Sequence, residues 1–167
     1  MKVKILGIFI INLLLWGTCL GPVFALEHTQ KNGLFSMDVP EGWHWVEYPQ
    51  EIIITYPDGN TMAIDIQLMP SRKHSQTEIK KAIKEADDKM IKQGIEAHSG
   101  VLLDDKEIKL DGIYAIQLDF KTAPPNTLHV TYVSFFNKGY VFTITYGSGD
   151  DKIHSVMDDV VGTFKFR

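Results

Sequence analysis

Hydrophobic and polar residues alternate along two stretches of the chain, and this pattern predicts β-strands. In the first stretch, apolar residues recur at every second position from Met62 to Leu68, shortly after the hairpin sequence Pro57-Asp58-Gly59-Asn60. In the second stretch, the same period runs over residues 114–120, 128–132 and 140–146. Short turn sequences separate these three segments, so we expect them to form an antiparallel meander.

Other segments predict strands on weaker patterns. Residues 34–39 and 43–48 flank a Pro-Glu-Gly turn, and residues 51–56 are rich in β-branched side chains. Residues 101–110 predict either one strand or two strands joined by a polar turn near Asp104-Asp105.

Two segments show the period of an α-helix. The capping box Ser75-x-x-Glu78 precedes a helix expected over residues 76–92, with Gly94 as its stop. The sequence Gly147-Ser148-Gly149-Asp150 is interpreted as the flexible start of a second helix, which ends at Gly162. The apolar face of the second helix is expected to hold Ile153, Val156, Met157 and Val160.

The order of these elements indicates an α+β fold. Strands that follow one another, with only two helices between them, predict an antiparallel sheet of about six to eight strands in two meanders, covered by the two amphipathic helices. Residues 26–32 lack a period and are interpreted as a flexible lead-in. A single domain is therefore expected over residues 33–167.

Residues 1–25 have the pattern of a signal peptide. Two lysines precede an apolar run from Ile5 to Trp16, and Val23-Phe24-Ala25 offers a site for signal peptidase. Cleavage after Ala25 would release the domain outside the cytoplasm, as a periplasmic or secreted protein. Two alternatives remain open: an uncleaved segment that tethers the domain, and a lipoprotein acylated at Cys19.

Composition narrows the class of protein. The chain has 167 residues, a net charge of -4 and one cysteine, which lies inside the predicted signal. An acidic chain is not expected to bind nucleic acid, because such proteins need clustered Lys and Arg to meet phosphates. The cleaved domain would hold no thiol, so cysteine catalysis and thiolate metal sites are excluded for it.

Three motifs carry a family resemblance: residues 35–43 (FSMDVPEGW), Gly112-Ile113-Tyr114-Ala115, and residues 160–166 (VVGTFKF). Together they resemble the PsbP-like superfamily, which includes PsbP proteins of the oxygen-evolving complex, Ran-binding Mog proteins and DcrB-type periplasmic proteins. The resemblance covers residues 33–167 and implies an α/β/α sandwich that acts as a non-enzymatic accessory or binding module. The motifs are structural, so no functional residue is carried over.

Six histidines are present, and none is spaced from another like the ligands of a helical metal site. His44 and His129 lie on predicted strands. They would form a zinc site only if they shared a face with Asp65 or Asp119, and we interpret both as partly exposed strand residues.

No sequence motif for catalysis is found. Four acidic doublets lack the alternating pattern of an EF-hand loop: Asp87-Asp88, Asp104-Asp105, Asp150-Asp151 and Asp158-Asp159. Neither a nucleophile elbow nor a phosphate loop is present. We therefore expect no enzyme, no catalytic residue, no cofactor and no metal ligand.

Two surface features invite a binding function. Trp43 and Trp45 share one strand face near Tyr48, although burial in the core is the favoured interpretation for both tryptophans. The first helix presents a lysine-rich face, which is suited to an acidic partner or lipid headgroups and is more commonly only solvated. This face comprises Lys80, Lys81, Lys84 and Lys92.

These features favour an exported, non-catalytic protein that binds a partner protein or stabilises an envelope complex. We expect a monomer that does not bind nucleic acid, with peripheral membrane association as an open alternative. A small-ligand or metal-binding periplasmic protein, and a hydrolase whose site assembles only in three dimensions, also remain as alternatives.

Overall fold

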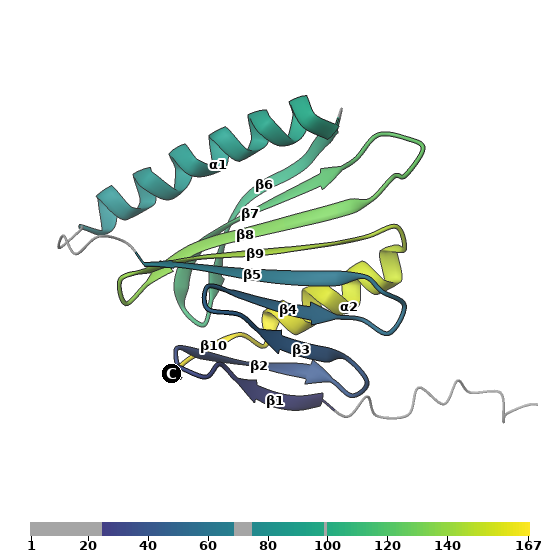
Figure 1. Ribbon diagram of the computed structural model, residues 1–167. Helices are drawn as coiled ribbons and strands as arrows, with labels where there is room; N and C mark the ends of the chain where they lie inside the picture. Colours follow the sequence, from purple (N-terminus) through teal and green to yellow (C-terminus); the bar gives the residue numbers. More distant parts are fainter. Residues whose placement is uncertain (1–24, 69–74, 99) are drawn as a thin grey trace, which may run out of the picture.

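The computed structural model describes residues 25–68, 75–98 and 100–167. Seven strands form a large antiparallel sheet: β3 (His44–Glu47), β4 (Glu51–Thr55), β5 (Thr61–Leu68), β6 (Val101–Leu110), β7 (Ile113–Lys121), β8 (His129–Asn137) and β9 (Tyr140–Ser148). Three strands form a small sheet: β1 (Ala25–Thr29), β2 (Phe35–Pro40) and β10 (Lys165–Phe166). The strand orders are β3-β4-β5-β9-β8-β7-β6 and β1-β2-β10 (Figure 1).

The large sheet contains most strands of the two predicted meanders, joined where β5 pairs with β9. The predicted strand at residues 34–39 instead forms β2 of the small sheet. The helix α1 (Gln76–His98) packs mainly on β6, β7 and β8, whereas α2 (Asp151–Gly162) lies on the opposite face and contacts β9 and β2 (Figure 1). The predicted α+β class, with an antiparallel sheet covered by two helices, is confirmed. Within the described residues, no helix is both long and apolar enough to cross a membrane.

The main core fills the space between the large sheet, α2 and the small sheet. Phe35 on β2 stacks on Phe164 with ring centroids 4.5 Å apart, and it meets the edge of Phe142 on β9 at 6.0 Å. A second apolar cluster lies under α1, where Ile79 and Ile83 meet the outward side chains of β7. The capping box of α1 forms as predicted, since the Ser75 amide donates to the Glu78 carboxylate at 2.8 Å.

The residues expected to form a flexible lead-in instead include β1, so that prediction is corrected. Leu26 and His28 pair with Val39 and Met37 of β2. Most side chains of β1 are exposed, so the strand is held by its backbone hydrogen bonds and shows no hydrophobic period. Residues 1–24 of the predicted signal lie outside the described residues.

Other boundaries also differ from the predictions. The helix α1 continues past Gly94 to His98, and residues 101–110 form one strand with a bulge between Leu102 and Asp104. The buried side of α2 includes His154, whereas the apolar Val156 is 38% exposed. The face of α2 that packs on the sheet therefore includes His154 and differs from the face that hydropathy predicts, which includes Val156.

Gly147 is part of β9 and not of a flexible helix start. A Cβ atom at this position would lie 2.8 Å from the His129 carbonyl oxygen and 3.0 Å from Val130 Cγ2. We expect Gly147→Ala to lower the free energy of unfolding by about 1–3 kcal/mol, because the two strands would have to move apart. Urea unfolding measures this loss. Gly162→Ala is the control, since a Cβ there has no neighbour within 4 Å, and an equal loss in both variants would contradict the account.

Candidate functional site

Among the described residues, helices cover only about half of one face of the large sheet. Because α1 packs mainly on β6, β7 and β8, no helix of the described residues lies over β3, β4, β5 and β9 on that side (Figure 1). Ile52 and Ile54 of β4 point into the main core, as do Met62 and Ile64 of β5. Successive side chains on a strand alternate between faces, so the residues between these point outward.

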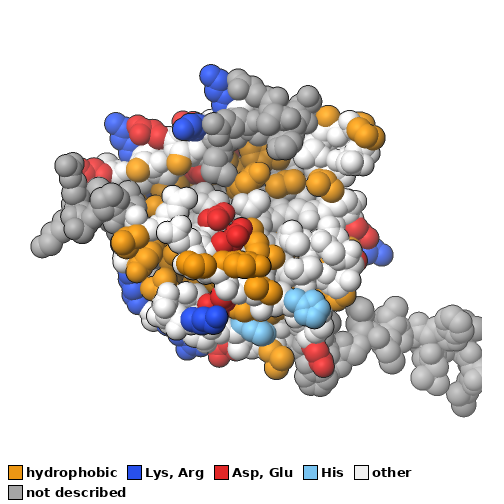
Figure 2. Space-filling model, in the orientation of Figure 1, with side chains coloured by type: hydrophobic (Ala, Val, Ile, Leu, Met, Phe, Trp, Pro, Cys, Tyr) orange, Lys and Arg blue, Asp and Glu red, His pale blue; other side chains and the backbone are white. Residues whose placement is uncertain are grey.

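We call this region the open sheet face. Its residues are His44, Val46, Glu51, Ile53, Ala63, Asp65, Gln67, Val141, Thr143 and Thr145. Val46, Ile53 and Ala63 are cross-strand neighbours and form an apolar row. Glu51 and Asp65 form a directly opposed acidic pair beside that row. Figure 2 shows hydrophobic side chains beside acidic groups on the side of the molecule seen in Figure 1.

The acidic pair is electrostatically unfavourable as it stands. Neither Glu51 nor Asp65 forms a salt bridge within the described part of the chain, and burial raises the pKa of Asp65. Like charges directly opposite on neighbouring strands destabilise a sheet. A cationic side chain from outside the protein would therefore be stabilised here.

The two histidines considered as zinc ligands lie on opposite faces of the sheet. His44 is exposed on the open sheet face and pairs with Thr55, whose row is separated from the row of Asp65 by the row of Ile53 and Ala63. His129 and Asp119 both lie on the α2 side, where they flank Thr131. Among the residues described, no group of three or more His, Cys, Asp or Glu side chains is arranged to hold a metal ion.

The structure reveals a buried polar chain that the sequence did not indicate. The His154 ring is 3% exposed, with Nε2 3.0 Å from Thr131 Oγ1 and Nδ1 3.5 Å from Asp158 Oδ2. Thr131 Oγ1 in turn donates to Asp119 Oδ1 at 2.5 Å. On the far side, Tyr146 donates its hydroxyl proton to Asp158 Oδ1 at 2.6 Å. The chain thus links α2 to three neighbouring strands.

Burial and hydrogen bonding set the pKa values along this chain. Burial alone would raise the pKa of Asp158, but its hydrogen bonds with His154 and Tyr146 outweigh that effect and lower it. Burial lowers the pKa of His129, and the charge of His154 lowers it further because the two rings stack with centroids 3.7 Å apart. These contacts hold α2 against the sheet. The Thr131 hydroxyl is fully buried, so it is not accessible as a nucleophile.

The two tryptophans anchor the core, as predicted. Trp43 meets the edge of Tyr56 at 5.0 Å. Trp45 stacks on His28 at 5.3 Å and donates from Nε1 to Glu47 Oε1 at 2.9 Å. Both indole rings pack against the main core, so they do not form an exposed aromatic patch.

The acidic doublets have separate structural surroundings. Asp87 is buried under α1 while Asp88 is exposed, and Asp104 pairs with Lys106 at 3.4 Å. Asp150 caps α2 by accepting from the Lys152 amide at 2.8 Å.

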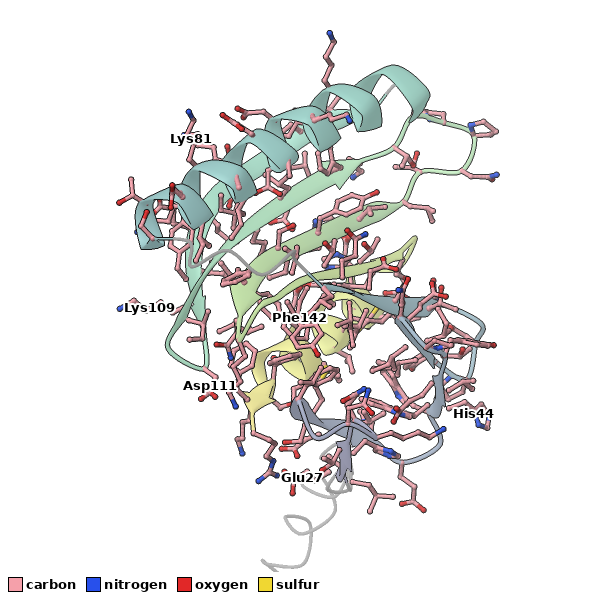
Figure 3. All side chains as sticks on the ribbon, turned by 60° about the vertical axis from the view of Figure 1, so that its left-hand side comes forward. Glu27, His44, Lys81, Lys109, Asp111 and Phe142 are labelled. Carbon is pink, nitrogen blue, oxygen red and sulfur yellow. The ribbon has the colours of Figure 1, made fainter. Side chains whose placement is uncertain are left out.

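The lysine-rich face of α1 is mostly solvated. Lys81 points away from the sheet and pairs with Glu85 at 3.7 Å (Figure 3). Lys80 differs from the others because its ammonium lies 4.2 Å from the centre of the Tyr114 ring.

Comparison with known proteins identifies the fold. No family model and no curated protein matches the chain. Among solved structures, cyanobacterial PsbP from Synechocystis sp. PCC 6803 is 16% identical with a TM-score of 0.64, covering 91% of this chain and 99% of that one. The Ran-binding protein Mog1p of Saccharomyces cerevisiae is 10% identical with a TM-score of 0.53, covering 85% and 95% of the two chains. LpqN of Mycobacterium tuberculosis, which is involved in cell envelope biogenesis, is 16% identical with a TM-score of 0.51, covering 83% and 87%.

At these identities the likeness concerns the fold. The chain has the α/β sandwich shared by PsbP and Mog1, as the resemblance in its sequence implied. The likeness therefore assigns no functional residue to this chain.

Proposed function

We propose that this protein is an exported, non-catalytic binding protein with the PsbP-like fold, and that it docks a partner protein on the open sheet face. The observation that carries the proposal is the unneutralised pair Glu51 and Asp65 beside the apolar row of Val46, Ile53 and Ala63. The partner offers a Lys or Arg to the acidic pair and apolar side chains to the row.

Charge and burial both favour docking of such a partner on the open sheet face. A Lys or Arg that reaches Asp65 forms a charge-assisted hydrogen bond with a carboxylate that is already partly desolvated. The same contact relieves the repulsion between the two carboxylates. Val46 is 45% exposed, so docking also removes apolar surface from water.

Two further observations support a binding role outside the cytoplasm. The similar protein Mog1p is Ran-binding, and the similar protein LpqN is involved in cell envelope biogenesis. The predicted signal at residues 1–25 supports export of this chain.

The proposal predicts that charge reversal on the open sheet face abolishes partner binding. The tagged full chain is expressed in its native host, and its partner is captured after crosslinking and identified. We expect Glu51→Lys combined with Asp65→Lys to weaken binding of that partner by at least about tenfold, because two attractive contacts become repulsive.

The control variant combines Glu41→Lys with Asp159→Lys, which makes the same change in net charge at two exposed sites outside the open sheet face. It should bind the partner as the unchanged protein does. An equal loss in both double variants would show that binding depends on net charge alone, and full binding by the first variant would refute docking on this face.

A further inference from the structure

A groove of about 410 Å³ lies between the start of α1, the β6–β7 turn and the β8–β9 turn. Its apolar lining includes Ile79 from α1, Ile113 from β7 and Phe136 from β8. A volume of this size is typical of a small-molecule site. We call it the basic groove, since three lysines also line it, and it shares no residue with the open sheet face.

The three lysines come from three different elements. Lys80 on α1 is held over the Tyr114 ring, and Lys138 in the β8–β9 turn donates to the backbone carbonyl of Arg167. Lys109 extends from β6 below the first turns of α1 (Figure 3). None of the three forms a salt bridge within the described residues. The lining of the groove therefore holds three cationic side chains and no acidic one, on a chain of net charge -4.

Two carboxylates that border the groove, those of Asp111 and Glu107, have partners of their own, and the charges of Asp87 and Asp105 also act on Tyr114 and raise its pKa. Asp111 accepts a hydrogen bond from the Phe166 amide at 2.9 Å. Glu107 is hydrogen-bonded to Tyr114; burial of the ring and this carboxylate both raise the pKa of Tyr114. Neither Asp111 nor Glu107 forms a salt bridge with a groove lysine among the described residues, so no carboxylate there neutralises the ammonium groups.

Lys138 occupies a position that suits other residues better. Its φ angle is +49°, and Gly139 follows at +88°, so both residues of this two-residue turn have a left-handed backbone. Asn, Asp and Gly are favoured there, and Asp111-Gly112 fills the equivalent turn between β6 and β7. A lysine at 138 thus strains the turn while placing a cation at the rim of the groove.

We propose that the basic groove binds an amphiphilic anion. The carboxylate, sulfonate or phosphate group of the ligand meets the lysines, and its apolar chain or ring lies against Ile79, Ile113 and Phe136. A free amphiphile and an anionic lipid headgroup with part of its acyl chain offer the same chemistry. The site is separate from the open sheet face, so it adds a ligand to the partner-binding function proposed above.

Titration with decanoate, followed by amide chemical shifts of the exported full-length protein, tests the proposal. We expect shifts confined to the β6–β7 turn, the β8–β9 turn and the start of α1. Decanol, which has the same chain without the charge, should bind at least about tenfold more weakly. Equal binding of decanol, or shifts centred elsewhere, would overturn the proposal.

Two lysine variants separate ligand binding from folding. Lys80→Gln combined with Lys109→Gln should weaken decanoate binding at least tenfold, whereas Lys84→Gln combined with Lys92→Gln on the exposed side of α1 should leave it unchanged. Lys138→Asn should also weaken binding, while the β8–β9 turn stays formed because Asn suits its backbone. A loss of equal size in the Lys84 and Lys92 variant would overturn the assignment.

Vesicle sedimentation distinguishes the two sources of the ligand. The groove receives a lipid headgroup if phosphatidylglycerol vesicles bind the unchanged protein but not the Lys80 and Lys109 variant, while phosphatidylcholine vesicles bind neither protein. If decanoate binds and vesicles do not, the ligand is a free amphiphile. Absence of both kinds of binding refutes the basic groove as a site, and it leaves the charge-reversal test of the open sheet face unaffected.

Discussion

Asp87→Asn is expected to stabilise the protein at neutral pH by about 1–3 kcal/mol. Asp87 lies on the inner side of α1, is only 3% exposed, and has both carboxylate oxygens buried without a hydrogen-bond partner. Burial raises its pKa from 3.8 to about 6, although the nearby hydroxyl of Ser134 on the facing strand β8 favours the charged carboxylate and lowers the pKa in part. The negative charges of Asp105 and Asp88 add to the rise.

The sign of the pH dependence follows from these values. The pKa of Asp87 is higher in the folded protein than in the unfolded chain, so the fold favours the protonated carboxyl group. Its stabilising contribution is complete below about pH 4 and is lost as the pH rises through 6. The rise in pKa corresponds to at most about 3 kcal/mol, which Asn avoids because it carries no charge.

Urea unfolding between pH 4 and pH 8 measures this effect. The difference in free energy of unfolding between Asp87→Asn and the unchanged protein should be larger at pH 8 than at pH 4. Asp88→Asn is the control, because Asp88 is the exposed neighbour on the same helix. A difference that does not vary with pH, or an equal pH dependence in the control, would show that Asp87 is not destabilising the contact of α1 with the sheet.

Phe35→Ala is expected to lower the free energy of unfolding by about 3–5 kcal/mol, the largest loss considered for this protein. The Phe35 ring is fully buried and contacts the rings of Trp45, Phe142 and Phe164. These contacts connect β2 of the small sheet to β3 and β9 of the large sheet. Truncation leaves a cavity where the two sheets meet, and neighbouring aromatic rings are too rigid to fill it.

Urea unfolding followed by both circular dichroism and tryptophan fluorescence measures the loss. The two signals should give the same midpoint, because the sheets share one core and unfold together. Tyr48→Ala removes an aromatic ring that is 56% exposed, so it should change the stability by less than about 0.5 kcal/mol. A loss below 1 kcal/mol for Phe35→Ala would mean that the two sheets are not held by this cluster.

The fold was predictable because most of its signals are local. The alternation around Ile64 specifies which side of β5 enters the core, and the Ser75 and Glu78 side chains cap α1 through contacts three residues apart. Gly59 has a φ angle of +95°, as the hairpin sequence between β4 and β5 requires. None of these features depends on which distant residue lies opposite.

The candidate sites were much less predictable because they depend on register and helix docking. Asp65 faces Glu51 only through the pairing of β4 with β5, and nothing near Asp65 in the sequence identifies that neighbour. His154 meets Thr131 only because α2 packs against the face of the large sheet on which Thr131 of β8 lies. Hydropathy places His154 and Thr131 on the solvent-exposed sides of their elements, whereas both side chains are buried in the structure. Hydrophobic patterns identify buried apolar residues. They do not identify polar residues that are buried because they form hydrogen bonds with one another.

Site-specific photo-crosslinking tests the central claim most directly. A photoreactive residue at Ile53, in the apolar row of the open sheet face, is compared with the same residue at Val156, which is exposed on α2 across the sheet. The account predicts that position 53 crosslinks a single partner protein through a segment that contains Lys or Arg, and that position 156 does not. Crosslinking of the same partner from position 156 but not from position 53 would contradict it.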